Sequence, residues 1–110
     1  MALYNITTKQ EFEDRVLHSS KVVLVDFWAE WCPPCRAMAP SLHNIGDKHD
    51  DIIDIVKVDI EATAENAGLA TEYQVRSIPN MVVFKGGKEV DRIIGLTPEV
   101  ALVDQLKKHA

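Results

Sequence analysis

The chain has 110 residues, of which 46% are apolar and 26% are charged, a composition typical of one globular domain spanning residues 1–110. Its formal net charge is −5, and no basic cluster occurs beyond Lys107 and Lys108, so we expect no nucleic-acid partner. No apolar run approaches the ~20 residues that cross a bilayer, so we expect no membrane association. The first ten residues lack the basic and apolar segments of a signal peptide, so the cytoplasm is the expected location.

The N-terminal part of the chain predicts a strand, a helix and a second strand. Leu3–Ile6 has the composition of a short strand. Thr8 and Glu11 have the spacing of a capping box, which predicts that a helix begins there. An apolar stripe at helical spacing supports this helix: Phe12, Val16 and Leu17. Val22–Phe27 is nearly continuous apolar sequence, which is typical of a central parallel strand covered on both faces.

The middle of the chain continues the alternation of helix and strand. A helix is expected to begin after Cys32 as its N-cap and to run through His49, because the two prolines that follow Cys32 are tolerated in a first helical turn. Ile53–Ile60 predicts a third strand, and Glu65–Tyr73 predicts a third helix.

A hairpin is expected near the C-terminus. Met81–Phe84 and Val90–Ile94 have strand composition and flank Gly86 and Gly87, a strong signal for a two-residue turn. The preceding alternation of strands and helices predicts a parallel sheet with right-handed crossovers and helices on both faces. The hairpin would add an antiparallel edge to that sheet.

The last helix is expected to begin with Thr97 as N-cap, Pro98 at the first helical position and Glu99 in the first turn. Its predicted core stripe consists of Val100, Val103 and Leu106. The expected fold is therefore α/β, a three-layer α/β/α sandwich with a mixed sheet of five strands and four helices.

The only two cysteines, Cys32 and Cys35, lie three positions apart. Residues at this spacing in a helix are ~5–6 Å apart, within the ~4.4–6.8 Å that a disulfide requires. So short a loop stabilises a fold only weakly, so the pair is more plausibly present for its chemistry. A zinc site with His43 and His49 is the alternative, but His43 would lie about 12 Å along the same helix.

The chain resembles the thioredoxin family over essentially its whole length. The resemblance rests on Val22–Trp31, the Cys32–Cys35 motif, Ile78-Pro79, Gly86-Gly87 and Ile94-Gly95. It implies a thioredoxin-like fold and a protein-disulfide reductase. Pro33 stands where the family usually has glycine, and the Pro-Pro motif also occurs in tryparedoxin-like and nucleoredoxin-like proteins. This departure leaves the reduction potential and the choice of partner open.

Four residues are expected to take part in the exchange chemistry: Cys32, Cys35, Asp26 and Lys57. Cys32, at a helix N-terminus that favours thiolate, is the expected attacking thiol, and Cys35 is the buried resolving thiol. Asp26 lies in an apolar strand, where desolvation would raise its pKa and allow it to accept the proton of Cys35 through water. Spacing alone is equally compatible with an Asp26 that faces solvent.

Lys57 is expected, by the resemblance, to form an ion pair with Asp26. The sequence alone more often indicates a strand lysine that extends its ammonium group to solvent.

The expected substrate-binding residues are Trp31, Pro33, Pro34, Ile78, Pro79 and Gly95. The resemblance implies that Pro79 is cis and that the backbone of Ile78 pairs with an extended substrate, a form of strand addition. Trp31, Ile78 and Gly95 would line an apolar rim, although ordinary packing is the alternative for each. For Trp28, the sequence is equally compatible with a role at the site and with ordinary core packing behind it.

The predicted function is reduction of protein disulfides in the cytoplasm by a monomer without a bound cofactor. By the resemblance, electrons come from NADPH through thioredoxin reductase, and the partners are that enzyme and disulfide-containing proteins. One alternative is a disulfide oxidase or isomerase, which would have a high reduction potential. Another is a non-redox binding subunit, which would tolerate replacement of both cysteines by serine.

Overall fold

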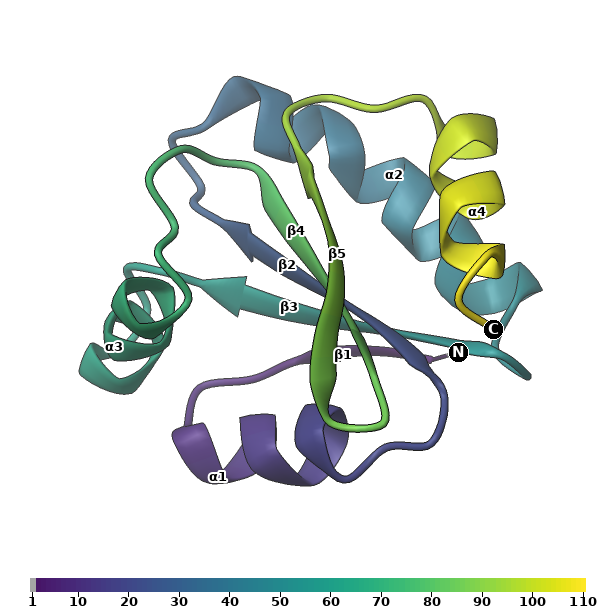
Figure 1. Ribbon diagram of the computed structural model, residues 1–110. Coiled ribbons are helices and arrows are strands. Elements are labelled where there is room, and N and C mark those ends of the chain that lie inside the picture. The colour runs from purple at the N-terminus through teal and green to yellow at the C-terminus, as the bar shows by residue number, and fades with distance from the viewer. Residues whose placement is uncertain (1) are drawn as a thin grey trace.

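The computed structural model describes residues 2–110, which form a mixed five-stranded sheet between two layers of helices (Figure 1). The order of the strands in the sheet is β1-β3-β2-β4-β5. Their bounds are β1 (Leu3–Asn5), β2 (Val22–Trp28), β3 (Ile53–Asp59), β4 (Asn80–Lys85) and β5 (Lys88–Ile94). β1, β3 and β2 run parallel, and β4 and β5 are antiparallel to their neighbours. The predicted mixed sheet is confirmed.

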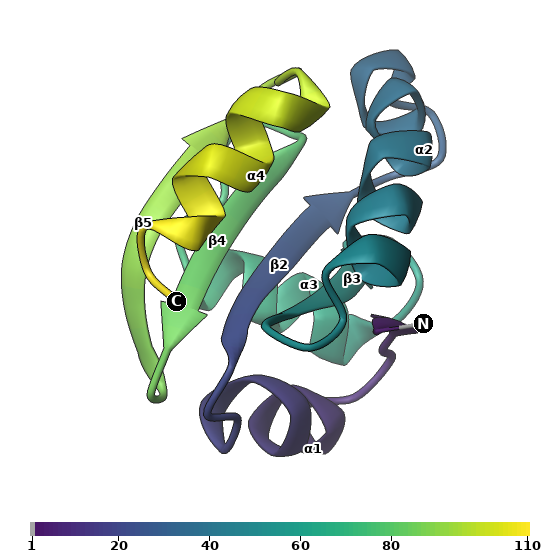
Figure 2. The same ribbon diagram turned by 90° about the vertical axis from the view of Figure 1, so that its right-hand side faces the viewer.

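The helices are α1 (Lys9–Phe12), which continues as a π-helical segment (Glu13–Leu17), α2 (Pro33–Lys48), α3 (Ala64–Glu72) and α4 (Glu99–Lys107). Figure 2 shows α2 and α4 in front of the sheet and α3 behind it. The predicted three-layer α/β/α sandwich is therefore confirmed. The sequence did not predict the π-helical segment, in which the His18 amide donates to the Glu13 carbonyl.

Two apolar cores lie on the two faces of the sheet, because successive side chains of a strand point to opposite faces. Under α2 and α4, Leu24 of β2 and Ile55 of β3 pack with helical residues such as Leu42. On the other face, Val25 and Val56 pack against side chains from α1 and α3. Both central strands are buried on both faces, as their continuous apolar sequences predicted.

The first helix has a capping pattern that differs by one residue from the predicted box. The Thr8 hydroxyl oxygen accepts a hydrogen bond from the Glu11 amide at 3.1 Å, as expected. The Glu11 carboxylate, however, accepts from the amide of Thr7 rather than that of Thr8. The predicted N-terminus of the helix is thus correct, although the reciprocal bond comes from the preceding residue.

The predicted start and core stripe of the last helix are wrong in two respects. The N-cap is Pro98, with φ −60° and ψ 143°, and the Thr97 hydroxyl instead donates to the Gly95 carbonyl at 3.2 Å. Val100 is 75% exposed, whereas Leu102 is fully buried. Two positions two residues apart are about 160° apart around a helix, so only one of them can face the core. The larger leucine occupies it, together with Leu106 one turn later.

The predicted hairpin turn is confirmed at Gly86 and Gly87, which have φ values of 60° and 77°. Two consecutive residues with positive φ favour glycine because other residues are strained there. At Gly87 there is a second constraint, since a Cβ atom would lie 2.8 Å from the carbonyl oxygen of Leu17. A Cβ atom at Gly86 would meet only open space.

These two glycines form a matched pair for a test of the turn. We expect Gly86→Ala to destabilise the fold by roughly 1 kcal/mol, the cost of the left-handed conformation. Gly87→Ala should cost about 1–3 kcal/mol more, because the backbone of Leu17 must also move. Urea unfolding of both variants measures the difference in the free energy of unfolding. Equal losses of stability would show that the backbone of Leu17 moves away from the added Cβ atom without cost.

Candidate active site

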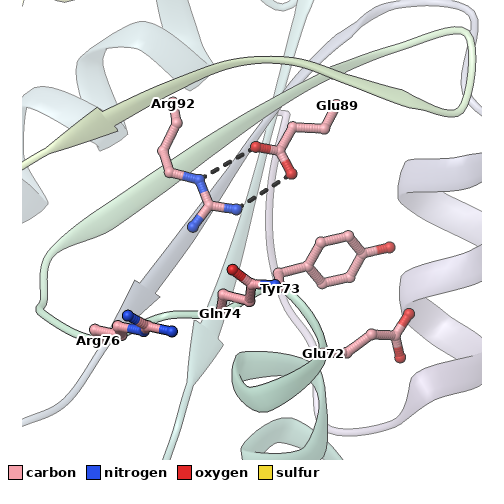
Figure 3. A pocket seen from close by; sticks show the side chains of 6 residues that line it. All are labelled: Glu72, Tyr73, Gln74, Arg76, Glu89 and Arg92. Atoms are coloured by element: carbon pink, nitrogen blue, oxygen red, sulfur yellow. Dashed lines mark hydrogen bonds and ion pairs between the residues drawn. The ribbon is translucent and has the colours of Figure 1, made fainter.

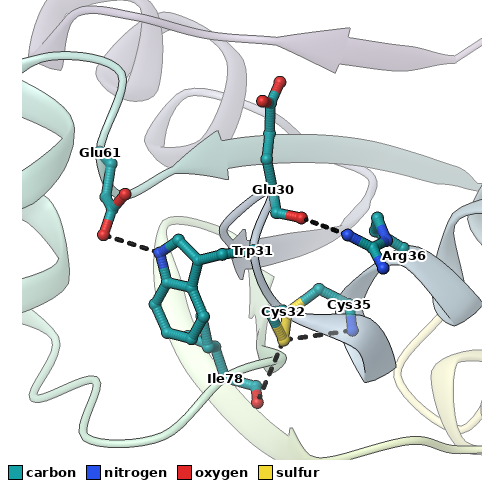
Figure 4. The surroundings of a disulfide bond; sticks show 7 residues. All are labelled: Glu30, Trp31, Cys32, Cys35, Arg36, Glu61 and Ile78. Atoms are coloured by element: carbon teal, nitrogen blue, oxygen red, sulfur yellow. Dashed lines mark hydrogen bonds between the residues drawn. A yellow bond between two sulfur atoms is a disulfide. The ribbon is translucent and has the colours of Figure 1, made fainter.

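The two cysteines form a disulfide at the N-terminus of α2, with their Cα atoms 5.2 Å apart (Figure 4). Cys32 is the N-cap, as predicted, and its Sγ accepts a hydrogen bond from the Cys35 amide at 3.3 Å. Pro33 and Pro34 occupy the first two helical positions and have no N–H groups. The Cys35 amide is therefore the first N–H group of this helix that can face the sulfur.

The loop that leads into β4 lies against the disulfide. The Ile78–Pro79 peptide bond is cis, as predicted, and the carbonyl oxygen of Ile78 lies 3.7 Å from Cys32 Sγ. The Gly95 amide donates to the Pro79 carbonyl at 2.9 Å, which joins the end of β5 to this loop. Gly95 has a φ of 90°, a conformation that favours glycine.

A groove of about 390 Å³ runs beside Cys32. Four of the predicted substrate-binding residues line it: Trp31, Pro33, Pro34 and Ile78. Cys32 lines it as well, whereas Cys35 does not. Pro79, in the loop itself, is buried, and the Gly95 amide contacts it through the backbone. Sequence reasoning missed four further lining residues, although three of them directly precede Ile78: Ile60, Val75, Arg76 and Ser77.

Trp31 forms one wall of the groove and is 60% exposed. Its indole Nε1–H donates to Glu61 Oε2 at 2.8 Å, which fixes the orientation of the ring (Figure 4). Sequence reasoning did not identify Glu61, because a lone acidic residue after a strand has no distinguishing pattern. The nearby Arg36 donates to the carbonyl oxygen of Glu30 at 2.9 Å.

Asp26 lies near the end of β2, on the face that α2 covers, and is 1% exposed. Desolvation raises its pKa to about 7, and the positive charge of Lys57 opposes that rise. Neither carboxylate oxygen has a hydrogen-bond partner among the protein atoms that the structure describes. The prediction of a buried Asp26 with a raised pKa is confirmed, and the solvent-facing alternative is wrong.

Lys57 lies opposite Asp26 in the register of β2 and β3, but it does not form the predicted ion pair. Its Nζ lies 4.3 Å from the centroid of the Trp28 ring instead. The long side chain of Lys57 thus reaches Trp28, which lies two positions after Asp26 on β2. Lys57 is only 7% exposed, so most of its side chain is buried, although its Nζ is not among the fully buried polar atoms without a partner.

A polar pocket of about 490 Å³ lies next to the groove and shares Arg76 with it (Figure 3). Its other lining residues are Glu72, Tyr73, Gln74, Glu89 and Arg92. Arg92 donates two hydrogen bonds of 3.2 Å to the Glu89 carboxylate. Burial, reinforced by the nearby carboxylates of Glu72 and Glu89, raises the pKa of Tyr73. This pocket contains no thiol, so the redox chemistry belongs to the groove.

Within residues 2–110, no three His, Cys, Asp or Glu side chains are grouped so that they could hold a metal ion. The zinc alternative with His43 and His49 therefore has no site in this part of the chain. The helices of the same residues are all too short or too polar to cross a membrane.

Comparisons with known proteins agree with this geometry. The thioredoxin family model matches residues 4–108. Thioredoxin 1 of Synechococcus elongatus is 42% identical over 109 residues, 99% of both chains. The chloroplastic M-type thioredoxin of Chlamydomonas reinhardtii is 45% identical over 89% of this chain and 68% of its own. The structure of a mutant thioredoxin from Halobacterium salinarum superposes with a TM-score of 0.87 at 33% identity, covering 97% of this chain and 89% of the other.

The chain belongs to the thioredoxin family. With its redox-active cysteine pair, it is a thiol-disulfide oxidoreductase that reduces protein disulfides.

The raised pKa of Asp26 predicts a loss of stability with increasing pH. The folded state retains the proton up to about pH 7, whereas the unfolded chain releases it near the ordinary value of 3.8. Stability from this group is therefore complete below the unfolded pKa and falls as pH rises through the folded pKa. Between pH 5 and pH 8, the wild type should lose roughly 2–3 kcal/mol relative to Asp26→Ala, measured by denaturant unfolding.

A carboxyl with a lowered pKa provides a control of opposite sign. Because His109 contacts Asp91 and a histidine changes charge between pH 5 and pH 8, Glu11 is the cleaner carboxyl for this control. Hydrogen bonds from the amide of Thr7 and from the hydroxyl groups of Thr7 and Thr8 lower the pKa of Glu11. Its contribution is present above the unfolded pKa and is lost as pH falls, so Glu11→Ala should leave the slope between pH 5 and pH 8 nearly unchanged. Parallel curves for the wild type and Asp26→Ala would contradict the raised pKa of Asp26.

Proposed function

We propose that Cys32 is the attacking thiol and Cys35 the resolving thiol of a two-step exchange. Cys32 thiolate attacks a substrate disulfide, forms a mixed disulfide and expels one substrate thiolate. Cys35 thiolate then attacks Cys32 Sγ, closes the Cys32–Cys35 disulfide and expels the second substrate thiolate. The substrate gains two electrons, and the protein loses them. The observation that carries this assignment is that Cys32 lines the groove while Cys35 does not.

Asp26 is proposed as the proton acceptor for Cys35. The second step needs the Cys35 thiolate, and Cys35 is buried in the first turn of α2. Asp26 lies on the face of the sheet that α2 covers, and its pKa of about 7 suits a base that works near neutral pH. Lys57 is the charged residue that opposes the effect of burial on this base.

The groove is proposed to bind an extended segment of the substrate protein. Its lining is mainly apolar and includes Trp31 and Ile78. The backbone of Ile78 would pair with the substrate by strand addition. Pro33 and Pro34 would contact the residues next to the substrate disulfide, and Gly95 would let the partner approach closely at the far side of the loop.

The source of electrons is proposed to be NADPH through thioredoxin reductase, with disulfide-containing proteins as the other partners. Membership of the thioredoxin family supports this proposal. No bound cofactor is required, because the two cysteines carry both electrons. A cytoplasmic monomer is proposed, although relatives act elsewhere, as the chloroplastic protein of Chlamydomonas reinhardtii shows.

Serine variants test the roles of the two thiols. We expect Cys35→Ser to stop at the mixed disulfide, because it can attack a substrate but cannot resolve the product. Cys32→Ser should form almost no adduct, since Cys35 does not line the groove. Intact mass spectrometry without reductant measures both variants after incubation with a disulfide-bonded peptide. An adduct on Cys35 in the Cys32→Ser variant would reverse the assignment.

An Asp26→Ala variant tests the proton acceptor. Its rate of insulin reduction at pH 7 should fall roughly 10-fold or more, because a positioned base contributes about 10²-fold or more to proton transfer. The matched control is Asp54→Ala on neighbouring β3, a partly buried carboxylate that pairs with Lys21 far from the disulfide. An unchanged rate for Asp26→Ala would remove Asp26 from the mechanism.

A further inference from the structure

We propose that Trp28 is a positioning residue, whose indole ring holds the Lys57 ammonium by a cation–π interaction and so keeps it out of a contact ion pair with Asp26. This inference rests on the proposed role of Asp26 as proton acceptor. It assigns a function to Trp28, for which the sequence is equally compatible with a role at the site and with ordinary core packing.

The geometry of three residues on β2 and β3 carries the proposal. Asp26 and Trp28 are two positions apart on β2, so both side chains point to the same face of the sheet. Lys57 is the register partner of Asp26 on β3. Its ammonium could therefore approach either neighbour, and it lies 4.3 Å from the centre of the Trp28 ring. That distance is well within the ~6 Å range of a cation–π interaction.

A buried ammonium needs a partner, because desolvation of a charge is costly. Lys57 is 7% exposed and forms none of the ion pairs or side-chain hydrogen bonds recorded among residues 2–110. Its Nζ is not among the fully buried polar atoms without a partner, so some solvent still reaches it. The ring of Trp28 is the protein group that lies against this ammonium. Partial desolvation strengthens the interaction relative to a fully exposed one.

Lys57 is the charged group that acts on Asp26. β4 places the apolar Met81 beside Asp26 in register. The two cysteines at the start of α2 are joined in the disulfide. Asp59 is a second carboxylate on the same face of β3, two positions after Lys57. It accepts a hydrogen bond from the Glu61 amide at 2.9 Å and forms none of the ion pairs recorded among residues 2–110. The position of the Lys57 ammonium therefore sets how strongly a positive charge acts on Asp26.

The position of the ammonium has a chemical consequence. A contact ion pair would favour the ionised carboxylate and lower the pKa of Asp26 by about 1–3 units, which would make it a weak base at neutral pH. With the ammonium over the ring, Lys57 opposes desolvation only in part, and the pKa stays at about 7. Trp28 thus acts on proton transfer through Lys57.

A purely structural role for Trp28 makes a different prediction. If the ring only excluded water, its removal would hydrate Asp26 and lower its pKa whether or not Lys57 were present. If the ring positions the ammonium, its removal would lower the pKa only while Lys57 remains. The two roles are separated by repeating the change in a Lys57→Met background.

The experiment is a carbon-13 NMR titration of the Asp26 carboxyl group in the oxidised protein. We expect Trp28→Leu to lower the midpoint by about one pH unit and Lys57→Met to raise it. In the Lys57→Met background, Trp28→Leu should leave the midpoint where Lys57→Met alone puts it. An unchanged midpoint in Trp28→Leu, or an equal fall in both backgrounds, would overturn the proposal. Trp28→Phe, a ring with a weaker cation–π interaction, should give an intermediate midpoint.

A second measurement needs no change at Trp28. The ε-methylene protons of Lys57 should be shifted upfield in the wild type by the ring current of the indole. Unshifted protons would overturn the proposal even if the Trp28 variants fail to fold. Because both measurements use the oxidised protein without turnover, they are independent of the kinetic test of Asp26. An unaltered rate of disulfide reduction in Asp26→Ala would refute the proton-acceptor role of Asp26. It would not change what the NMR measurements say about the position of the Lys57 ammonium.

Discussion

The active site depends on the way α2 begins. A helix leaves its first N–H groups without partners inside the helix, and some other group must accept them. Here two prolines remove two of these groups, and the sulfur of Cys32 accepts from the Cys35 amide. The start of the helix and the environment of the reactive sulfur are therefore one structural feature. The sheet places this feature, because β2 ends at Trp28, only four residues before Cys32.

A buried carboxylate under the same helix shows that the site is maintained at a cost to stability. Asp26 would be replaced by an apolar residue if packing alone mattered, since its neighbours on β2 are all apolar. Desolvation penalises its charged form and moves its pKa close to neutrality. The same burial that lowers stability as pH rises toward neutrality gives Asp26 the pKa that its proposed role as a base requires.

Sequence reasoning predicted the features that depend on local pattern. The apolar runs of β2 and β3, the glycine pair of the hairpin and the cysteine cap of α2 are each determined by a few adjacent residues. It failed where two local solutions compete or where a side chain chooses among distant partners. Val100 and Leu102 are both apolar, and only the tertiary packing decides which one faces the core.

Lys57 illustrates the second kind of failure. Register alone places it beside Asp26, but the conformation of its long side chain depends on the ring of Trp28. The Trp31–Glu61 hydrogen bond likewise joins residues 30 positions apart without any motif.

The asymmetry of the groove imposes an order on the chemistry. Both cysteines are almost fully buried, but only Cys32 lines the groove, together with Trp31 and Ile78. Cys35 lies on the inner side of the same turn, toward the sheet. In the proposed exchange a substrate disulfide therefore meets Cys32 first, at a helix N-terminus that favours thiolate without a buried base. In the same proposal Cys35 loses its proton only after the mixed disulfide covers the groove, and at that stage bulk water is a poorer acceptor than a carboxylate already on the inner side.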